Sequence, residues 1–151
     1  MSKRTDTPYL DPMQSLGYLS RINYRAFSRA LEAQTVKHGV TSGQWRFLRV
    51  LWEEDDITQR ELSHRVGIKE ATTVRAVESL ENSGFITRTR SNEDRRRIMI
   101  RLTPRARRLR DRLMPMVLEV NTRAMQGISK KDVEVTRRVL RKTFENLTAE
   151  D

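Results

Sequence analysis

The stretch from Thr58 to Thr103 constrains this chain most, because two short helical patterns are followed there by two alternating segments around a polar turn. Thr58 begins the first helical pattern. Its hydroxyl can accept an early helix amide, and Glu61, three residues later, can reach back to the amide of Thr58 in a capping box. Gly67 then supplies the left-handed conformation with which many helices end. The spacing predicts a short helix between these two residues.

A second helix is expected from about Lys69 to Ser83, with Val74, Val77 and Leu80 at three-residue spacing as its buried stripe. The opposite stripe is formed by small or basic residues, namely Thr72, Arg75, Ala76 and Ser79. Such a face lets a helix approach a DNA major groove closely, with Arg75 reaching guanine and Thr72 reaching a phosphate or base edge. The alternative is an ordinary solvated face.

After Gly84, residues 86–90 (ITRTR) and 98–102 (IMIRL) alternate with period two, which predicts a two-stranded hairpin. The turn between them, SNEDRRR, carries three consecutive arginines that repel one another. Their clustering is explained if one guanidinium enters a narrow minor groove and others contact phosphates. We interpret Asp94 as the internal partner that orients an arginine by a bidentate pair. The whole stretch therefore predicts a winged helix-turn-helix.

The motifs NSGFITR and NEDRRRIMIRLT resemble the MarR family of bacterial transcriptional regulators, whose wing carries Asp-x-Arg shortly before Leu-Thr. That pattern falls here on Asp94, Arg96, Leu102 and Thr103. The resemblance spans nearly the whole chain, including one leading and two trailing helices. It implies an obligate homodimer, a palindromic operator, and a small-molecule ligand that weakens DNA binding from a cleft between the first two helices and the fifth.

The segments outside this stretch read as helices that complete a dimerisation unit. Residues 12–38 carry a helical stripe rich in small residues, and Thr103 followed by Pro104 is a strong helix start. Ser129 with Asp132 caps a last helix. We predict one mainly α-helical domain in four parts: a mobile N-terminal segment (1–11), a dimerisation helix (12–38), a DNA-binding lobe with a two-stranded β-wing (39–103), and C-terminal helices (104–151).

The charge is strongly asymmetric. The net charge is +10, and residues 86–112 hold eleven arginines against three acids, which accounts for +8 of it. Clustering of this kind is typical of nucleic-acid binding. A basic membrane-surface helix is the competing interpretation, but the wing has no apolar face to insert. The chain has no cysteine, no signal peptide and no apolar run approaching 18 residues, so we expect no disulfide, no membrane partner and a cytoplasmic, nucleoid-associated location.

Nothing in the sequence suggests catalysis. The two histidines, His38 and His64, have no carboxylate or cysteine at metal-ligand spacing. There is also no glycine-rich phosphate loop and no serine in a nucleophile-elbow context. We therefore expect no enzyme activity, no metal and no cofactor.

The leading hypothesis is a homodimeric, ligand-responsive regulator, acting as a repressor on a palindromic operator in double-stranded DNA. The predicted DNA-binding residues are Lys69, Thr72, Thr73 and Arg75 on the second helix, with Arg88, Arg90, Asp94, Arg95 and Arg96 on the wing. The predicted ligand site comprises Arg21, Tyr24, Arg25 and Trp45, whose basic and aromatic character suits an anionic aromatic compound such as a phenolic acid or its coenzyme A thioester. The alternatives are a ligand-independent structural or chromosomal DNA-binding protein and, less favoured for want of an aromatic platform, an RNA-binding protein.

Overall fold

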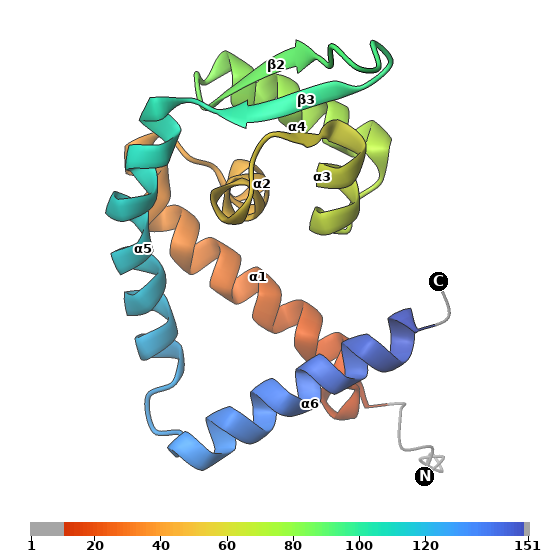
Figure 1. Ribbon diagram of the computed structural model, residues 1–151. Coiled ribbons are helices and arrows are strands. Elements are labelled where there is room, and N and C mark those ends of the chain that lie inside the picture. The colour runs from red at the N-terminus through yellow and green to blue at the C-terminus, as the bar shows by residue number, and fades with distance from the viewer. Residues whose placement is uncertain (1–10, 150–151) are drawn as a thin grey trace, which may run out of the picture. The chain divides into compact units, whose positions relative to one another are not determined.

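The computed structural model describes residues 11–149 and divides into two compact units, one ending at Val117 and one beginning at Leu118. Figure 1 shows the elements. In chain order they are η1 (Pro12–Gln14), α1 (Leu16–Thr35), η2 (Val36–His38), α2 (Ser42–Glu53), β1 (Ile57–Thr58), α3 (Gln59–Val66), α4 (Glu70–Asn82), β2 (Ile86–Arg90), β3 (Ile98–Leu102), α5 (Pro104–Ala124) and α6 (Lys130–Thr148). The predicted fold class, a mainly helical winged helix-turn-helix, is confirmed.

The leading helix differs from the single segment predicted over residues 12–38. Asp11 caps a 3-10 turn by accepting from the amide of Met13 at 3.0 Å, and Ser15 then caps α1 by accepting from the amide of Tyr18 at 3.3 Å. Ser15 takes an extended conformation, so the helix begins anew there. Apart from Asp11, the predicted mobile segment lies outside the described residues.

The capping signals of α2 and α3 decide where the two helices begin. In α2 the full capping box is present: the amide of Gln44 donates to Thr41 Oγ1 and the amide of Thr41 donates to Gln44 Oε1, both at 3.2 Å. In α3 only half of the predicted box forms, with the amide of Glu61 donating to Thr58 Oγ1 at 3.0 Å. The carboxylate of Glu61 instead accepts from Arg65 Nε at 2.7 Å, one turn later.

Within residues 11–149 the wing is a three-stranded antiparallel sheet in the order β1-β3-β2, rather than the predicted two-stranded hairpin. The predicted strands pair with Ile86 opposite Leu102 and Arg90 opposite Ile98. The additional strand, β1, places Ile57 opposite Ile100. A two-residue strand is too short to show an alternating pattern, so the sequence alone did not reveal it.

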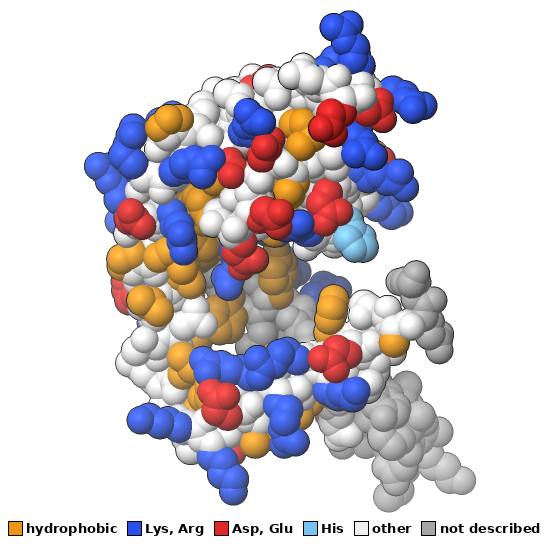
Figure 2. Space-filling view, viewed as in Figure 1, with side chains coloured by type: hydrophobic (Ala, Val, Ile, Leu, Met, Phe, Trp, Pro, Cys, Tyr) orange, Lys and Arg blue, Asp and Glu red, His pale blue; other side chains and the backbone are white. Residues whose placement is uncertain are grey.

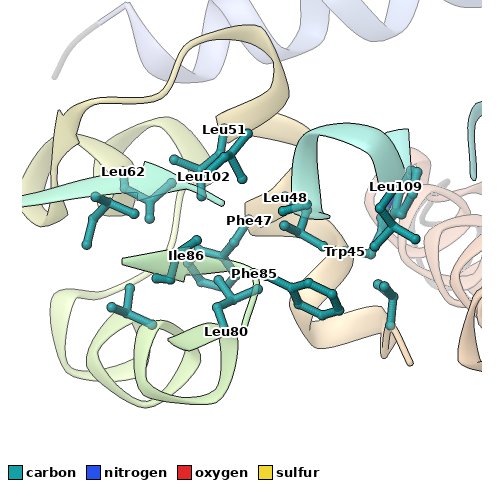
Figure 3. Packing of buried hydrophobic residues seen from close by; sticks show 14 of the residues in the cluster. Trp45, Phe47, Leu48, Leu51, Leu62, Leu80, Phe85, Ile86, Leu102 and Leu109 are labelled. Carbon is teal, nitrogen blue, oxygen red and sulfur yellow. The ribbon is translucent and has the colours of Figure 1, made fainter. Parts of the chain in front are cut away.

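The hydrophobic core lies where α2, α3 and α4 meet the sheet and the first turns of α5. Figure 3 shows the close packing of Phe47, Phe85, Ile86 and Leu80 at its centre. Phe47, Phe85 and Leu80 are fully buried, and Ile86 is 2% exposed. This core holds α4 and the sheet in one rigid unit, so a helix surface and a hairpin turn can act together.

The second unit contains the end of α5 and α6. Ser129 caps α6 by accepting from the amide of Asp132 at 3.1 Å, as predicted. Several large apolar side chains of α6 are exposed, among them Phe144 at 68% and Leu147 at 82%. In the part of the chain that the structure describes, no helix is both long and apolar enough to cross a membrane.

Candidate nucleic-acid interface

A polar clamp joins α3 to α4 and decides which face of α4 is buried. Thr73 Oγ1 donates to Ser63 Oγ at 2.9 Å, and Ser63 Oγ donates to the carbonyl of Ile68 at 2.6 Å. The side chain of Thr73 is fully buried, so the prediction that it contacts DNA is wrong. Val74, predicted to be buried, is 38% exposed instead. Thr73 takes the place of Val74 in the buried stripe. Its hydroxyl can be buried because it is hydrogen-bonded to the hydroxyl of Ser63.

The exposed face of α4 carries three of the predicted DNA-binding residues. Lys69 is the N-cap residue, and Thr72 and Arg75 follow on the first turns, all three exposed. Among residues 11–149 neither Lys69 nor Arg75 forms an ion pair or a side-chain hydrogen bond. Both cations are therefore available to an external anion.

The other half of the predicted stripe, Ala76 and Ser79, contacts the core and α2, although Ser79 is still exposed. Ala76 packs against the core. Gln44 Nε2 donates to Ser79 Oγ at 3.0 Å and to Ser83 Oγ at 2.9 Å, which ties the first turn of α2 to the C-terminal half of α4. Gln44 is 6% exposed. Its hydrogen-bond partners lie more than thirty residues away along the chain, so no local sequence pattern reveals this contact.

The turn of the wing is built around Asp94, but not through the bidentate pair that was predicted. One carboxylate oxygen of Asp94 accepts from the backbone amide of Arg96 at 3.0 Å and from its Nε at 3.3 Å. The other oxygen lies 3.7 Å from Arg97 Nε. The hydrogen bond from the backbone amide of Arg96 holds one oxygen of Asp94 beside Arg96, which leaves the other oxygen for Arg97. Asp94 therefore shares its carboxylate between two arginines. The side chain of Arg96 is still 92% exposed.

The remaining arginines of the wing differ in availability. Arg95 and Arg90 are exposed and have no acidic partner within residues 11–149. Figure 2 shows Lys and Arg side chains projecting from the end of the sheet where the hairpin of Figure 1 turns. Arg88, in contrast, is engaged by Glu81 through two bonds, Nε to Oε2 at 2.9 Å and Nη2 to Oε1 at 3.1 Å.

This ion pair makes Arg88 a link between β2 and α4, whereas the sequence predicted a DNA-binding role for it. Its side chain is 29% exposed, and the hydrogen bond to Glu81 raises the pKa of Arg88. The same hydrogen bond lowers the pKa of Glu81. A charge already matched by a bidentate carboxylate gains little from a phosphate.

The acidic residues that follow α2 bind the base of the wing. Asp55 Oδ2 accepts from the backbone amide of Leu102 at 2.8 Å and from Arg107 Nη2 at 2.6 Å. Asp56, at a φ of 61°, accepts from Arg101 at 2.6 and 3.0 Å, and these hydrogen bonds lower the pKa of Asp56. The loop thus joins the end of α2 to β3 and α5.

A second cationic site lies between α1 and the first turn of α2. A groove of about 300 Å³ is lined by Tyr24, Arg25, Ser28, Arg29, Glu32, Ser42, Gly43 and Arg46. Glu32 Oε1 accepts from the backbone amide of Ser42 at 2.9 Å, which fixes the entry of α2 against α1. Of the predicted ligand residues, Tyr24 and Arg25 line this groove and Arg21 does not.

Trp45 belongs to the core rather than to a ligand site. It is 8% exposed, and its ring meets that of Trp52 edge to face at 5.4 Å. Trp52 Nε1 donates to the carbonyl of Ala106 at 2.9 Å, which holds the pair against α5. The groove between α1 and α2 includes no residue of α5, unlike the cleft that the family resemblance implies.

Comparison with known proteins identifies the family and the fold. The MarR family model matches residues 40–98. The HTH-type transcriptional regulator TtmR of Methylorubrum extorquens is 33% identical over 88 residues, which cover 58% of this chain and 45% of the relative. The match thus spans about half the length of that curated relative.

Two solved structures extend the likeness over most of the chain. The first, a MarR transcriptional regulator from Methanosarcina mazei, is 27% identical with a TM-score of 0.83 and covers 89% of this chain and 97% of its own. The second, the PcaV transcriptional regulator of Streptomyces coelicolor in complex with its natural ligand, is 26% identical with a TM-score of 0.78 over 90% and 96%.

Proposed function

Because the MarR family model matches residues 40–98, within the winged helix-turn-helix, we propose that this protein is a transcriptional repressor that binds an inverted-repeat operator as a homodimer. The observation that carries the proposal is the pairing of two unneutralised cationic surfaces on one rigid unit. Lys69 and Arg75 lie on the exposed face of α4, and Arg90 and Arg95, which have no acidic partner among the described residues, lie on the wing. A helix in the major groove and a wing at the adjacent minor groove read one half-site together.

The proposed dimer would cover apolar side chains that are otherwise exposed. On α1, Leu16 is 57% and Tyr24 is 53% exposed, and on α6 Phe144 and Leu147 are exposed still further. Large apolar side chains that cluster on an exposed surface often mark an interaction site. Two-fold symmetry would then repeat the DNA-reading surfaces, which is the reason to expect an inverted repeat.

DNase footprinting over the gene's own upstream region, together with sedimentation of the purified chain, tests this function. We expect a dimer that protects one inverted repeat and prefers it to scrambled duplex by at least about 10³-fold. Uniform coating of many sites would instead indicate the alternative, a structural or chromosomal DNA-binding protein. A monomer without sequence preference would contradict the proposed function.

We further propose that an anionic aromatic acid, alone or as a coenzyme A thioester, releases the protein from DNA by binding in the groove between α1 and α2. Arg25, Arg29 and Arg46 can hold its carboxylate by charge-assisted hydrogen bonds while Tyr24 supplies an aromatic wall. The PcaV relative, crystallised with its natural ligand, makes ligand response a reasonable expectation for this fold.

The position of this groove suggests how a bound ligand would change the position of α4, the DNA-reading helix. Ser42 and Gly43 line the groove, and Gln44, the next residue, is bonded to Ser79 and Ser83 at the C-terminal half of α4. A ligand that shifts the first turn of α2 would therefore move α4. The ligand can shift the equilibrium between the DNA-binding position of α4 and the displaced position only by the difference in its affinity for the two.

Titration with hydroxybenzoates and phenolic acids, followed by tryptophan fluorescence, is expected to show a saturable change, because Trp45 follows directly after the helix turn that lines the groove. An Arg29→Ala variant should bind the active acid roughly tenfold or more weakly, since it loses a charge-assisted hydrogen bond. The matched control is Arg138→Ala on α6, outside the groove. Equal affinities in both variants would contradict the groove assignment.

A further inference from the structure

A larger groove than the one just described lies between the end of η2 and the first turns of α5. Its volume is about 510 Å³, and its walls bring together Lys37, His38, Arg105, Arg108, Leu109 and Arg112. The three arginines lie at spacings of three and four residues, so they follow one face of α5. Figure 2 shows basic side chains gathered over the first turns of α5.

The cations of this groove are not neutralised. Among residues 11–149, Lys37, Arg108 and Arg112 have no carboxylate within ion-pair distance. Their neighbour Arg107, on another face of α5, is in contrast paired with Asp55 at 2.6 Å. Like charges that share a concave surface repel one another, and a bound anion removes that cost.

The walls of the groove favour a polyanion over a small organic ligand. Sites for small molecules are lined mainly by apolar and aromatic side chains, with few polar groups. Here Leu109 is the single large apolar wall residue, and at 8% exposure it belongs mostly to the core. The remaining side chains are cationic or imidazole, and the cations are exposed, as suits contact with a phosphate backbone.

The groove is continuous with the C-terminal end of the DNA-reading helix. Arg105 Nη1 donates to the carbonyl of Ser83, the C-cap of α4, at 2.8 Å. The same guanidinium lies 5.1 Å from the ring centroid of Phe85. Gly84 permits this approach, because a Cβ there would lie 3.2 Å from Arg105 Nη1, and its φ is +73°. Arg105 thus joins the groove to α4.

We infer that this groove is a third DNA contact, which binds backbone phosphates of the operator through Lys37, Arg108 and Arg112 in addition to the contacts of α4 and the wing. The inference rests on the proposed function. Phosphate contacts position a protein without reading sequence. The groove therefore contributes affinity and salt dependence, while operator preference stays with α4 and the wing.

The test is the salt dependence of DNA binding by the full chain, measured for the operator and for scrambled duplex. Each substitution removes one phosphate contact from each protomer of the proposed dimer, so Arg108→Gln and Arg112→Gln should each lower the slope of log affinity against log salt by about 1.8, and the double variant by about twice that. Binding at the low-salt end should weaken for both duplexes alike, leaving their ratio unchanged. The charge-matched control is Arg138→Gln on α6, which should keep the wild-type slope.

The outcomes separate this inference from the proposed function. If both groove variants kept the wild-type salt dependence of DNA binding and still preferred the operator, the third DNA contact would be rejected. The proposed regulator function would be unaffected. Loss of operator preference in the wild-type protein would overturn the regulator. Calorimetry with inorganic pyrophosphate tests whether the groove instead binds a free phosphate ligand. If the wild-type protein bound pyrophosphate, the double variant did not, and the salt dependence of DNA binding were the same in both, the groove would be a phosphate-ligand site and the DNA contact would be rejected. Lys37→Gln repeats the test on η2 if a helix variant fails to fold.

Discussion

An Arg75→Ala variant is expected to bind its operator about 1–3 kcal/mol more weakly and to discriminate less between the operator and single-base variants of it. Arg75 is exposed on α4 and has no acidic partner among the described residues, so its guanidinium is free to donate to the edge of a guanine. The loss should fall mainly on the specific site, because the contact reads a base. Competition gel shifts over a set of singly substituted operators measure both effects.

Arg138→Ala, which removes the same charge from α6, is the control for electrostatics alone. A second comparison is Thr73→Val, because Thr73 is buried and would change stability rather than base preference. If Arg75→Ala weakened binding to the operator and to scrambled duplex by the same factor, Arg75 would contact phosphate. Another residue of α4 would then have to contact the bases.

A Phe47→Ala variant is expected to lose about 3–5 kcal/mol of free energy of unfolding, the largest effect of any substitution considered for this protein. Phe47 is fully buried at the centre of the core, between α2 and the sheet. Truncation removes apolar burial and leaves a cavity that the surrounding helices cannot fill. Urea denaturation followed by circular dichroism measures the change.

Phe47→Leu is the control, since it keeps most of the volume and should cost far less than the alanine variant. Because the core holds α4 against the sheet, Phe47→Ala should also weaken DNA binding at temperatures where the lobe begins to unfold. Equal stabilities of Phe47→Ala and wild type would mean that the core centred on Phe47 does not stabilise the lobe.

The local signals of the sequence were sufficient to predict most of the helices and the two strands of the hairpin. Thr58 and Ser129 each cap a helix at the expected position, and Gly67 ends α3 with a φ of 71°. These signals work because a capping hydrogen bond joins residues two to four positions apart, so the chain carries both partners in one short segment. The alternating strands of the hairpin are local in the same sense.

The assignment of single side chains to the interface needed the tertiary structure. Thr73, Arg88 and Trp45 have residue types that suit DNA or ligand contact, and each is instead taken up by packing or by a partner: Ser63 for Thr73, Glu81 for Arg88, and the core for Trp45. Helical periodicity places a residue on a face within about one position, which does not decide between neighbours such as Thr73 and Val74.

The sequence by itself determined the winged helix-turn-helix, the cationic wing and the family resemblance, since these depend on spacing, capping and charge along short segments. The tertiary structure alone decided which cations remain free, because an ion pair forms or fails to form according to which acid lies across the fold. It paired Asp55 with Arg107 over 52 positions and left Arg108, the next residue, unpaired in a groove shared with Lys37. Contacts over such separations leave no periodic trace in the chain.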